Sequence, residues 1–366
     1  MATRTIEQGP SYREPLPSSE KSTRPKLGFG KYWPERILDN YEIASWEVVR
    51  KSSTGEPWSE KDFTDITGIK SRRIAGPRET LLKMGLDATQ QALDSMPGTI
   101  DCVFVTTNFP TGVNLSAEIA KEFGITGFNM DFYAGCAGFG GVLHSIKEIE
   151  KYFLGKRILF VDTQRIHDHL RDLRNNTGKD GKPIDQALQQ VLFTDGANAM
   201  IVDYGKDFTV IFSKLHLIEK DEEGKIVNDA IKLPIDKSLV IPPAYLLPVP
   251  YTPSGFIEQN GHRVFKFMCK NVPQLVRRDL KDYPSIKKLD IHQASGPVVD
   301  FVIKAMPEYE IGRDCKDGNP SSGTLPKRYR DLFLNNEIKI GDERKFAVYG
   351  AGYLAVTGVV KFGDKA

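Results

Sequence analysis

From residue 26 onward the chain alternates short apolar runs with longer amphipathic stretches, and this alternation restricts the folds open to it. Apolar side chains recur at helical spacing through residues 80–95 and 138–153, which predicts two helices. Compact apolar runs around them predict strands at residues 26–32, 101–107, 128–134, 158–162 and 197–202. Strands that alternate with helices predict an α/β fold, with helices packed against mixed sheets.

The second half of the chain repeats this pattern. It predicts helices at residues 261–282 and 297–306, and strands at residues 289–292, 346–349 and 354–362. Residues 164–190 and 219–259 are polar or rich in proline, and we interpret them as insertions whose role stays open. Residues 1–25 contain few large apolar side chains, so we expect a polar N-terminal tail outside the core.

Composition narrows the classes of function. The chain has 50 Lys and Arg against 48 Asp and Glu, a net charge of +2, which argues against a nucleic-acid partner. No apolar run approaches the roughly 20 residues of a membrane-spanning helix, so we expect no membrane span. The four cysteines form no C-x-x-C pair, which argues against a disulfide framework and against a metal site. We therefore expect free thiols and a cytoplasmic protein.

Cys136 is the strongest candidate for a chemical role. It follows a predicted strand and precedes a predicted helix, and small residues flank it on both sides (Ala134, Gly135, Ala137 and Gly138). Such flanks permit a sharp turn and the close approach of a ligand. A thiol at a helix N-terminus faces the positive end of the helix dipole, so we expect this position to favour thiolate. The pattern predicts a nucleophile, although an isolated cysteine is more often a buried structural residue.

Two further residues complete a candidate constellation. His292 ends a short apolar strand just before Gly296 and Pro297, which predict the start of a helix. Asn319 lies in a turn, Asp317-Gly-Asn-Pro-Ser-Ser, that on its own indicates only a loop followed by a helix cap. His167 and His169 are two residues apart in a polar stretch and are weak evidence for a metal. The order Cys136, His292, Asn319 is informative only as a set.

That set resembles the β-ketoacyl-[acyl-carrier-protein] synthase III family of thiolase-fold condensing enzymes. The matching motifs run in order from residue 26 to the end of the chain: Trp33-Pro-Glu-Arg36, Thr67-Gly-Ile69 with Arg73, Ala134-Gly-Cys-Ala-Gly-Phe139, Phe193-Thr-Asp-Gly-Ala197, Gly261 with Val264-Phe-Lys266, His292-Gln-Ala294, Gly318-Asn-Pro-Ser-Ser322 and Gly350-Ala-Gly352. The resemblance implies a duplicated βαβαβ core in five layers, αβαβα. Residues 26–205 would form the half with the cysteine, and residues 206–366 the half with the histidine and asparagine. It also implies a homodimer.

The resemblance further implies a reaction. Cys136 would take an acyl group from a coenzyme A or acyl carrier protein thioester, and the backbone N–H groups of Cys136 and Ala351 would hold the tetrahedral oxyanion. His292 and Asn319 would donate hydrogen bonds to the carbonyl of a malonyl-type thioester. Loss of carbon dioxide would leave an enolate that attacks the acyl-enzyme, a decarboxylative Claisen condensation with a 3-oxoacyl product. This chemistry needs no metal and no redox cofactor.

The sequence departs from the family where the thioester carrier binds. Asp62 and Ile66 stand where a tryptophan and an arginine usually bracket the coenzyme A adenine, so we consider Trp58 or Phe63 as a replacement. Two further arginines are replaced by Ala187 and Pro297. We expect Asn114, Phe193, Gly350 and Gly352 to line the substrate site. The polar residues Thr111, Asn114 and Ser116 fall in a loop that usually closes the acyl pocket, which suggests a short or polar acyl group.

Three other functions stay open. An acyltransferase of the same fold would move the acyl group from Cys136 to an oxygen or nitrogen of a small metabolite. A cysteine hydrolase would also use Cys, His and Asn in this chain order. The hydrolase ranks low because Cys136 lies deep in the chain and is followed by Ala137 and Gly138 rather than by an aromatic residue. A non-catalytic subunit of a heterodimeric synthase would have no need for the complete set of three residues.

Overall fold

The structure, a computed structural model, describes residues 24–108, 111–170, 172–175, 187–218, 231–234, 251–252, 257–259, 261–350 and 354–363. Among the residues of interest, Ala351 and Gly352 lie outside these ranges, as does almost all of the predicted N-terminal tail.

The first of two five-stranded sheets is built by the N-terminal half of the chain. Its strands, in spatial order, are β1 (Leu27–Tyr32), β7 (Gly196–Asp203), β6 (Arg157–Gln164), β4 (Cys102–Thr107) and β5 (Phe128–Tyr133). Strands β4, β5 and β6 are parallel, whereas β1 and β7 run antiparallel to their neighbours. Every residue of β4 is buried, as expected for a central strand with helices on both faces.

The second sheet belongs to the C-terminal half. Its order is β13 (Glu310–Ile311), β12 (Lys288–Ile291), β14 (Asp342–Tyr349), β15 (Leu354–Phe362) and β8 (Phe208–Leu217). Strand β12 is parallel to β13 and β14, and β15 is antiparallel to β14 and β8. The arrangement repeats that of the first sheet, with two antiparallel strands beside a parallel group.

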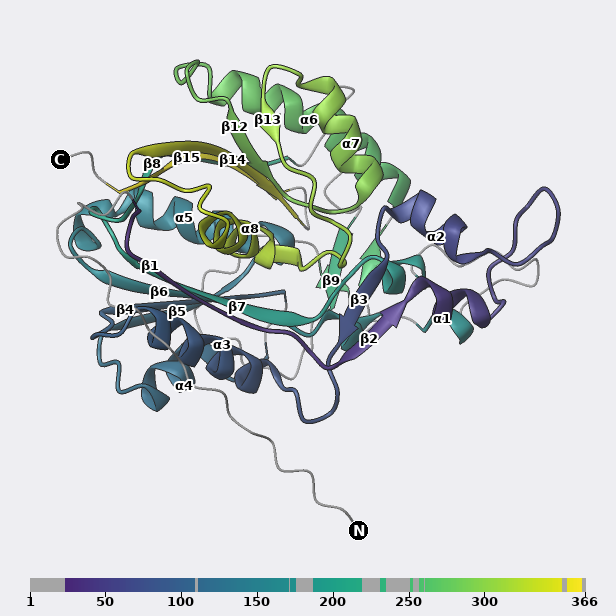
Figure 1. Ribbon diagram of the computed structural model, residues 1–366, viewed down its shortest axis with the longest axis horizontal. Coiled ribbons are helices and arrows are strands. Elements are labelled where there is room, and N and C mark those ends of the chain that lie inside the picture. The colour runs from purple at the N-terminus through teal and green to yellow at the C-terminus, as the bar shows by residue number, and fades with distance from the viewer. Residues whose placement is uncertain are drawn as a thin grey trace, which may run out of the picture.

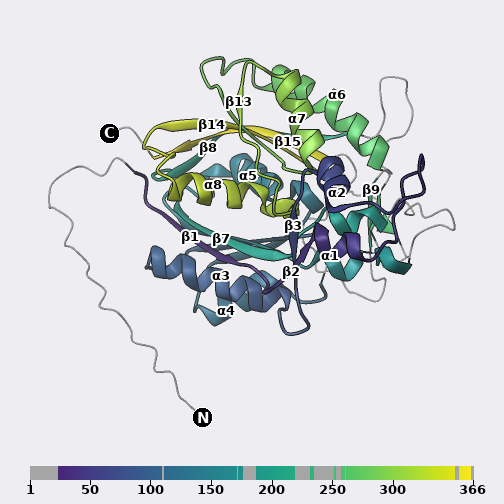
Figure 2. The same cartoon turned by 45° about the vertical axis from the view of Figure 1, so that its right-hand side comes forward.

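Helices form three layers around the two sheets (Figures 1 and 2). Helices α3 (Leu81–Ser95) and α4 (Leu115–Glu122) cover the outer face of the first sheet. Helices α5 (Gly138–Glu148) and α8 (Thr324–Leu334) lie between the sheets, and α6 (Gly261–Asp279) and α7 (Gly296–Ala305) cover the outer face of the second. The five-layer α/β arrangement expected from the sequence is therefore present.

Shorter elements extend one end of this body. They are β2 (Arg36–Asp39), β3 (Ser71–Ile74), α1 (Asn40–Ser45), α2 (Glu60–Thr67), β9 (Ile231–Pro234), β10 (Tyr251–Thr252) and β11 (Glu258–Gln259). Strands β2 and β3 form an antiparallel pair, and a separate small sheet joins β9, β10 and β11. Helix α2 begins at Ser59, whose side chain forms a capping box with Asp62.

Most predicted elements match the observed ones closely, and the differences have local causes. The helix predicted over residues 80–95 begins one residue later because the Thr80 side chain caps it by accepting from the Lys83 N–H. The helix predicted over 138–153 ends at Glu148, after which a 3₁₀ turn (Glu150–Tyr152) follows. The boundary predicted between residues 205 and 206 falls in the turn between β7 and β8, and the division into two halves stays a prediction.

No helix in the described ranges is long and apolar enough to cross a membrane.

Candidate active site

Cys136 sits in a tight turn between β5 and α5. Gly135 has a φ of 50°, a left-handed conformation that suits glycine, and it opens the 3₁₀ turn η1 (Gly135–Ala137) that places the thiol just before α5. Small side chains then let other segments approach. A Cβ on Gly138 would lie 3.2 Å from the Cβ of Ser322, and one on Gly140 would lie 2.2 Å from a methyl carbon of Val348. The glycines thus bring the C-terminal half against the cysteine.

The segment that reaches Cys136 is the 3₁₀ turn η7 (Ser321–Gly323), which follows Asn319. The Ser321 Oγ lies 3.3 Å from the Cys136 Sγ, and the Asn319 side chain is also close enough to lower the pKa of the thiol. The Asn319 Oδ1 accepts a hydrogen bond from the Ser321 N–H at 2.8 Å, which fixes the carboxamide. Two residues about 180 positions from Cys136 therefore meet it directly.

His292 reaches the same turn from the end of β12. Its Nδ1 lies 3.0 Å from the Thr324 Oγ1, and that hydroxyl lies 3.0 Å from the Ser321 carbonyl oxygen. The Tyr349 hydroxyl donates to the His292 carbonyl at 3.0 Å, and the two rings meet edge to face with centroids 5.0 Å apart. The imidazole is thus held on two sides, and the structure brings all three residues predicted as catalytic around η7.

Burial dominates the ionisation of this site. It raises the pKa of the Cys136 thiol to about 11, and the nearby Asp162 carboxyl adds to the rise, while hydrogen bonds from Ser321 and Asn319 oppose it. Contrary to the expectation that the helix N-terminus favours thiolate, burial therefore favours the protonated thiol in the free protein. Burial also lowers the pKa of His292 to about 3, so the imidazole is neutral at physiological pH.

The backbone amide of Cys136 faces the turn that follows β14. A Cβ placed on Gly350 would lie 3.0 Å from the Cys136 nitrogen and 2.7 Å from the Ala137 nitrogen. Only a residue without a side chain leaves this space open, so Gly350 keeps the amide accessible to a small atom. Ala351, predicted to supply the second oxyanion donor, and Gly352 lie outside the described residues.

A cluster of buried apolar side chains borders the thiol. Cys136 packs with Phe193 and four other apolar side chains, Ile166, Leu170, Leu192 and Ile257. The Asn319 N–H donates to the Leu192 carbonyl at 2.8 Å, and the Thr194 N–H donates to the Asn319 carbonyl at 3.0 Å. These bonds tie Phe193 to the asparagine turn. Of these side chains, only Phe193 was predicted from the sequence.

Trp58, Phe63 and Asn114, which were also predicted to bind substrate, make local contacts. Phe63 is buried beneath Trp58, with ring centroids 5.1 Å apart, so only the half-buried Trp58 has a ring surface for a ligand. The side chain of Asn114 caps α4 by accepting from the Ala117 N–H at 2.9 Å. Thr111 and Ser116 also bond locally, to the Val113 carbonyl and to Asn114. The polarity of this loop therefore serves the backbone and the helix cap.

The described residues contain no cluster of His, Cys, Asp or Glu that could hold a metal ion. The Nδ1 of His167 instead lies 3.2 Å from a carboxylate oxygen of Asp195. All four cysteines are free thiols.

Comparison with known proteins gives a consistent result, although no family model matches the sequence. The β-ketoacyl-[acyl-carrier-protein] synthase III of Prochlorococcus marinus (strain MIT 9312) is 26% identical over 350 residues, which cover 92% of this chain and 96% of that protein. The enzyme of the same name from Streptomyces lividans is 29% identical over 342 residues, 89% of this chain and 91% of that protein. The chain is a homologue of the synthase III enzymes. The resemblance inferred from the ordered motifs is therefore confirmed.

The fold agrees with this relationship. The crystal structure of 3-oxoacyl-(acyl carrier protein) synthase III from Pseudomonas aeruginosa PAO1 matches with a TM-score of 0.71, covering 92% of this chain and 97% of that one at 19% identity. The predicted thiolase fold is thus confirmed. The homologues also confirm the prediction of an acyltransferase-type condensing enzyme.

Proposed function

We propose that the protein loads an acyl group from a coenzyme A or acyl carrier protein thioester onto Cys136 and condenses it with a malonyl-type thioester, giving a 3-oxoacyl product. One observation carries this proposal: the 3₁₀ turn η7 contacts the Cys136 thiol through Ser321, follows Asn319 directly, and is joined to His292 through the Thr324 hydroxyl, beside a cluster of apolar side chains. Three groups from distant parts of the chain share one site, and each has a task in this reaction.

Acyl loading comes first. The Cys136 thiolate attacks the thioester carbonyl, and the negative oxygen that forms is held by the Cys136 N–H beside Gly350 and, in our proposal, by the Ala351 N–H. The carrier leaves as a thiol when the tetrahedral intermediate collapses. The acyl chain would lie against the apolar cluster that contains Phe193, and the close packing of this cluster supports a short apolar acyl group.

Condensation follows on the same cysteine. The bond between the malonyl carbon and its carboxylate breaks, carbon dioxide leaves, and the electron pair forms an enolate on the thioester. Hydrogen bonds from neutral His292 and from the Asn319 amide stabilise the enolate oxygen. The enolate carbon attacks the acyl-enzyme carbonyl, and Cys136 leaves. These steps transfer no electrons to or from an acceptor, so we propose that the thioester substrates suffice and that no cofactor is required.

Intact-protein mass spectrometry tests the proposal and identifies the donor. The protein is mixed with coenzyme A and acyl carrier protein thioesters of increasing chain length, and a malonyl thioester is added afterwards. We expect an acyl adduct with short chains, which malonyl thioester then discharges as 3-oxoacyl product. Loading of long straight chains as fast as short ones would contradict the preference for a short acyl group. An adduct that malonyl thioester leaves intact would contradict condensation.

A second function, acyl transfer to an oxygen or nitrogen of a small metabolite, is supported by the position of Thr324. Its hydroxyl has one proton and two acceptors in reach, the Ser321 carbonyl and the His292 Nδ1, each at 3.0 Å. If Thr324 donates to Nδ1, the proton of His292 is on Nε2, which then acts as a donor to an enolate. If Thr324 donates to Ser321, the proton is on Nδ1, and Nε2 becomes a base for an alcohol or amine.

The tautomer of His292 therefore separates the two functions. We expect long-range ¹H–¹⁵N spectra of ¹⁵N-histidine-labelled protein, assigned by comparison with His292→Ala, to show a proton on Nε2. Thr324→Val should shift the tautomer population of His292 towards the Nδ1-protonated form, and it should slow condensation more than acyl loading. Thr324→Ser, which keeps the hydroxyl, should have the tautomer and the condensation rate of the unmodified protein. A proton on Nδ1 in the unmodified protein would favour the acyltransferase instead.

We also propose that the protein works as a homodimer in the cytoplasm. Strand β5 is at the edge of its sheet, and Phe128 at its start is 43% exposed, which suits pairing with a second copy. The free thiols are compatible with a reducing compartment. Light scattering should give twice the chain mass of 41.0 kDa, and a mass near 41.0 kDa at micromolar concentration would contradict the dimer.

A further inference from the structure

A buried carboxyl group near the thiol has no role in the reaction described above. Asp162 lies on β6, only 1% exposed, in the sheet that carries the Cys136 turn. Its Oδ1 accepts hydrogen bonds from the Thr106 hydroxyl at 2.8 Å, from the Gln164 amide at 2.7 Å and from the Ser322 hydroxyl. Its Oδ2 has no hydrogen-bond partner among the described residues. A buried carboxyl with one oxygen that accepts no hydrogen bond is costly to ionise, which suggests that Asp162 has a function at this position.

A continuous polar path joins this carboxyl to the thiol. The Gln164 amide that donates to Asp162 has its Oε1 3.1 Å from the Asn108 N–H. The Asn108 Oδ1 accepts from the Ser321 hydroxyl at 2.5 Å, and the Ser321 Oγ lies 3.3 Å from the Cys136 Sγ. Ser322, which donates to Asp162, is the neighbour of Ser321 in η7. A change of charge on Asp162 therefore affects the pKa of the Cys136 thiol in two ways: directly through space, and through the hydrogen bonds of the side chains between them.

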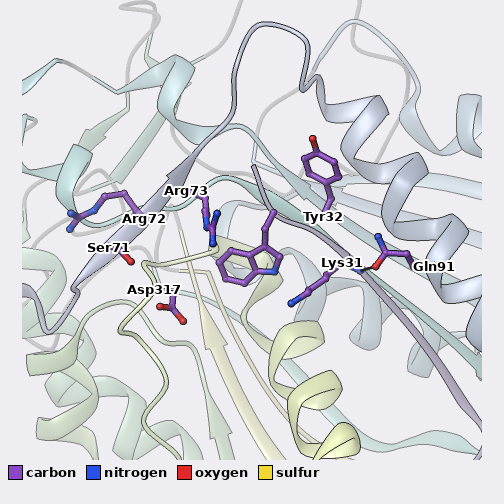
Figure 3. A pocket seen from close by; sticks show the side chains of 8 residues that line it. Lys31, Tyr32, Ser71, Arg72, Arg73, Gln91 and Asp317 are labelled. Carbon is purple, nitrogen blue, oxygen red and sulfur yellow. Dashed lines mark hydrogen bonds between the residues drawn. The ribbon is translucent and has the colours of Figure 1, made fainter. Parts of the chain in front are cut away.

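Asp162 also borders a small cavity of about 10 Å³, which Gln164, Asn198, Tyr32 and Trp33 line as well. Tyr32 and Trp33 also line an open hollow of about 530 Å³, together with Lys31, Arg73 and Asp317 (Figure 3). A cavity of about 10 Å³ holds about one water, so the buried carboxyl has space beside it for a water molecule.

The charged groups around Asp162 have their own partners. Lys327 and Asp195 line the small cavity, and Lys327 forms ion pairs with Asp314 and Asp331. Arg330 bonds Asp331 and the Asn198 carboxamide. Thr106 on β4 and Ser322 on η7 present hydroxyls only. Cys136 is thus the titratable group on which a charge at Asp162 acts most directly, and ionised Asp162 disfavours its thiolate.

We propose that Asp162 is a positioning residue that sets the reactivity of Cys136: the neutral carboxyl permits thiolate formation, and the carboxylate suppresses it. The proposal rests on the proposed function only in treating Cys136 as the nucleophile. Burial raises the pKa of the Asp162 carboxyl to about 7, so the two states exchange within the physiological range. Below that pH the thiol has a neutral neighbour, and above it the thiol faces a negative charge.

Alkylation of Cys136 by iodoacetamide, followed by intact-protein mass spectrometry between pH 5.5 and 9, tests this directly. In the unmodified protein the logarithm of the rate should flatten near pH 7 and then rise again. Asp162→Asn preserves the three acceptor contacts without the charge, so its profile should rise without a flat region. The two proteins should react equally at pH 5.5, and the variant about tenfold faster at pH 8.5, since a coupling of one pKa unit gives that ratio.

Two controls make the result specific. Cys136→Ser gives the background from the other thiols. Asp131→Asn removes a different buried carboxyl, which accepts from the Leu115 and Ser116 N–H groups, and it should keep the flat region. A rate shift of equal size at every pH in Asp162→Asn would indicate a purely structural role and would overturn the proposal.

If Asp162→Asn does not fold, a straight profile through pH 6–8 in the unmodified protein overturns the proposal equally. Alkylation does not depend on any thioester substrate. Failure of the proposed function, seen as a missing acyl adduct, is therefore distinguishable from failure of this inference.

Discussion

Cys136→Ala should abolish the acyl-enzyme completely. Cys136 combines a backbone amide beside Gly350, a hydrogen bond from Ser321 to its sulfur and an adjoining cluster of apolar side chains. Burial raises the pKa of all four thiols, so it is this setting that distinguishes Cys136; of the others, Cys102 and Cys315 are buried. Intact-protein mass spectrometry after mixing with a short acyl thioester measures the adduct.

The matched control is Cys269→Ala, which removes the half-buried thiol of α6 and should keep the full adduct. An adduct that survives in Cys136→Ala would place the nucleophile elsewhere and remove the basis of the proposed reaction.

His292→Ala and Asn319→Ala should each preserve the acyl adduct and lower the rate of condensation by a factor of about 10² to 10³, the usual effect of losing one preorganised donor. Both side chains are fixed, the imidazole by Thr324 and the carboxamide by the Ser321 N–H. Because burial lowers the pKa of His292 to about 3, protonation of this imidazole should not limit the rate at pH 5 or above. Release of carbon dioxide from malonyl thioester by preloaded enzyme provides the measurement.

His144→Ala is a suitable control, since it removes an imidazole of the same central layer that hydrogen-bonds Ser213, remote from the thiol. Condensation should continue at the normal rate in that variant. Equal rates in His292→Ala and the unmodified protein would show that the imidazole takes no part in decarboxylation.

The central strands and the cysteine turn were predictable because the residue types within each segment indicate its structure without reference to the rest of the chain. Every residue of strand β4 is either apolar or β-branched, as expected for a strand buried on both faces. Glycines on both sides of Cys136 indicate a tight turn whatever the rest of the chain does, and the structure has that turn. Joining Cys136 to His292 and Asn319 required the order of many motifs, because no local pattern connects residues so far apart.

Other elements could not be read from local pattern. Strand β8 has half-exposed residues along much of its length, so its sequence lacks the alternation that marks a strand with one solvent-facing side. Helix α8 buries Lys327 and Arg330, which resemble solvent-facing residues in the sequence and are tolerated inside because Asp314 and Asp331 neutralise them.

The electrostatics of the site were also hidden from the sequence. A helix N-terminus after Gly135 suggests a thiolate, but the burial that raises the pKa of Cys136 comes from η7 and β14, which are remote in sequence. Asp162 ends an apolar run and so suggests nothing more than the end of a strand. Its significance comes from Thr106, Gln164 and Ser322, which three separate segments bring to one oxygen.

The two halves of the chain resemble each other in topology, yet they share one hydrophobic core. One continuous apolar interior contains Phe104 and Val142 from the first half together with Val348 and Phe362 from the second. Helix α5 buries one side against each sheet. A fragment that stopped after β7 would expose one side of helix α5 to water. A fragment beginning at β8 would lack helix α5, against which β8 and β15 pack. Each half therefore supplies a surface that the other needs, and we expect neither half to fold when it is produced alone.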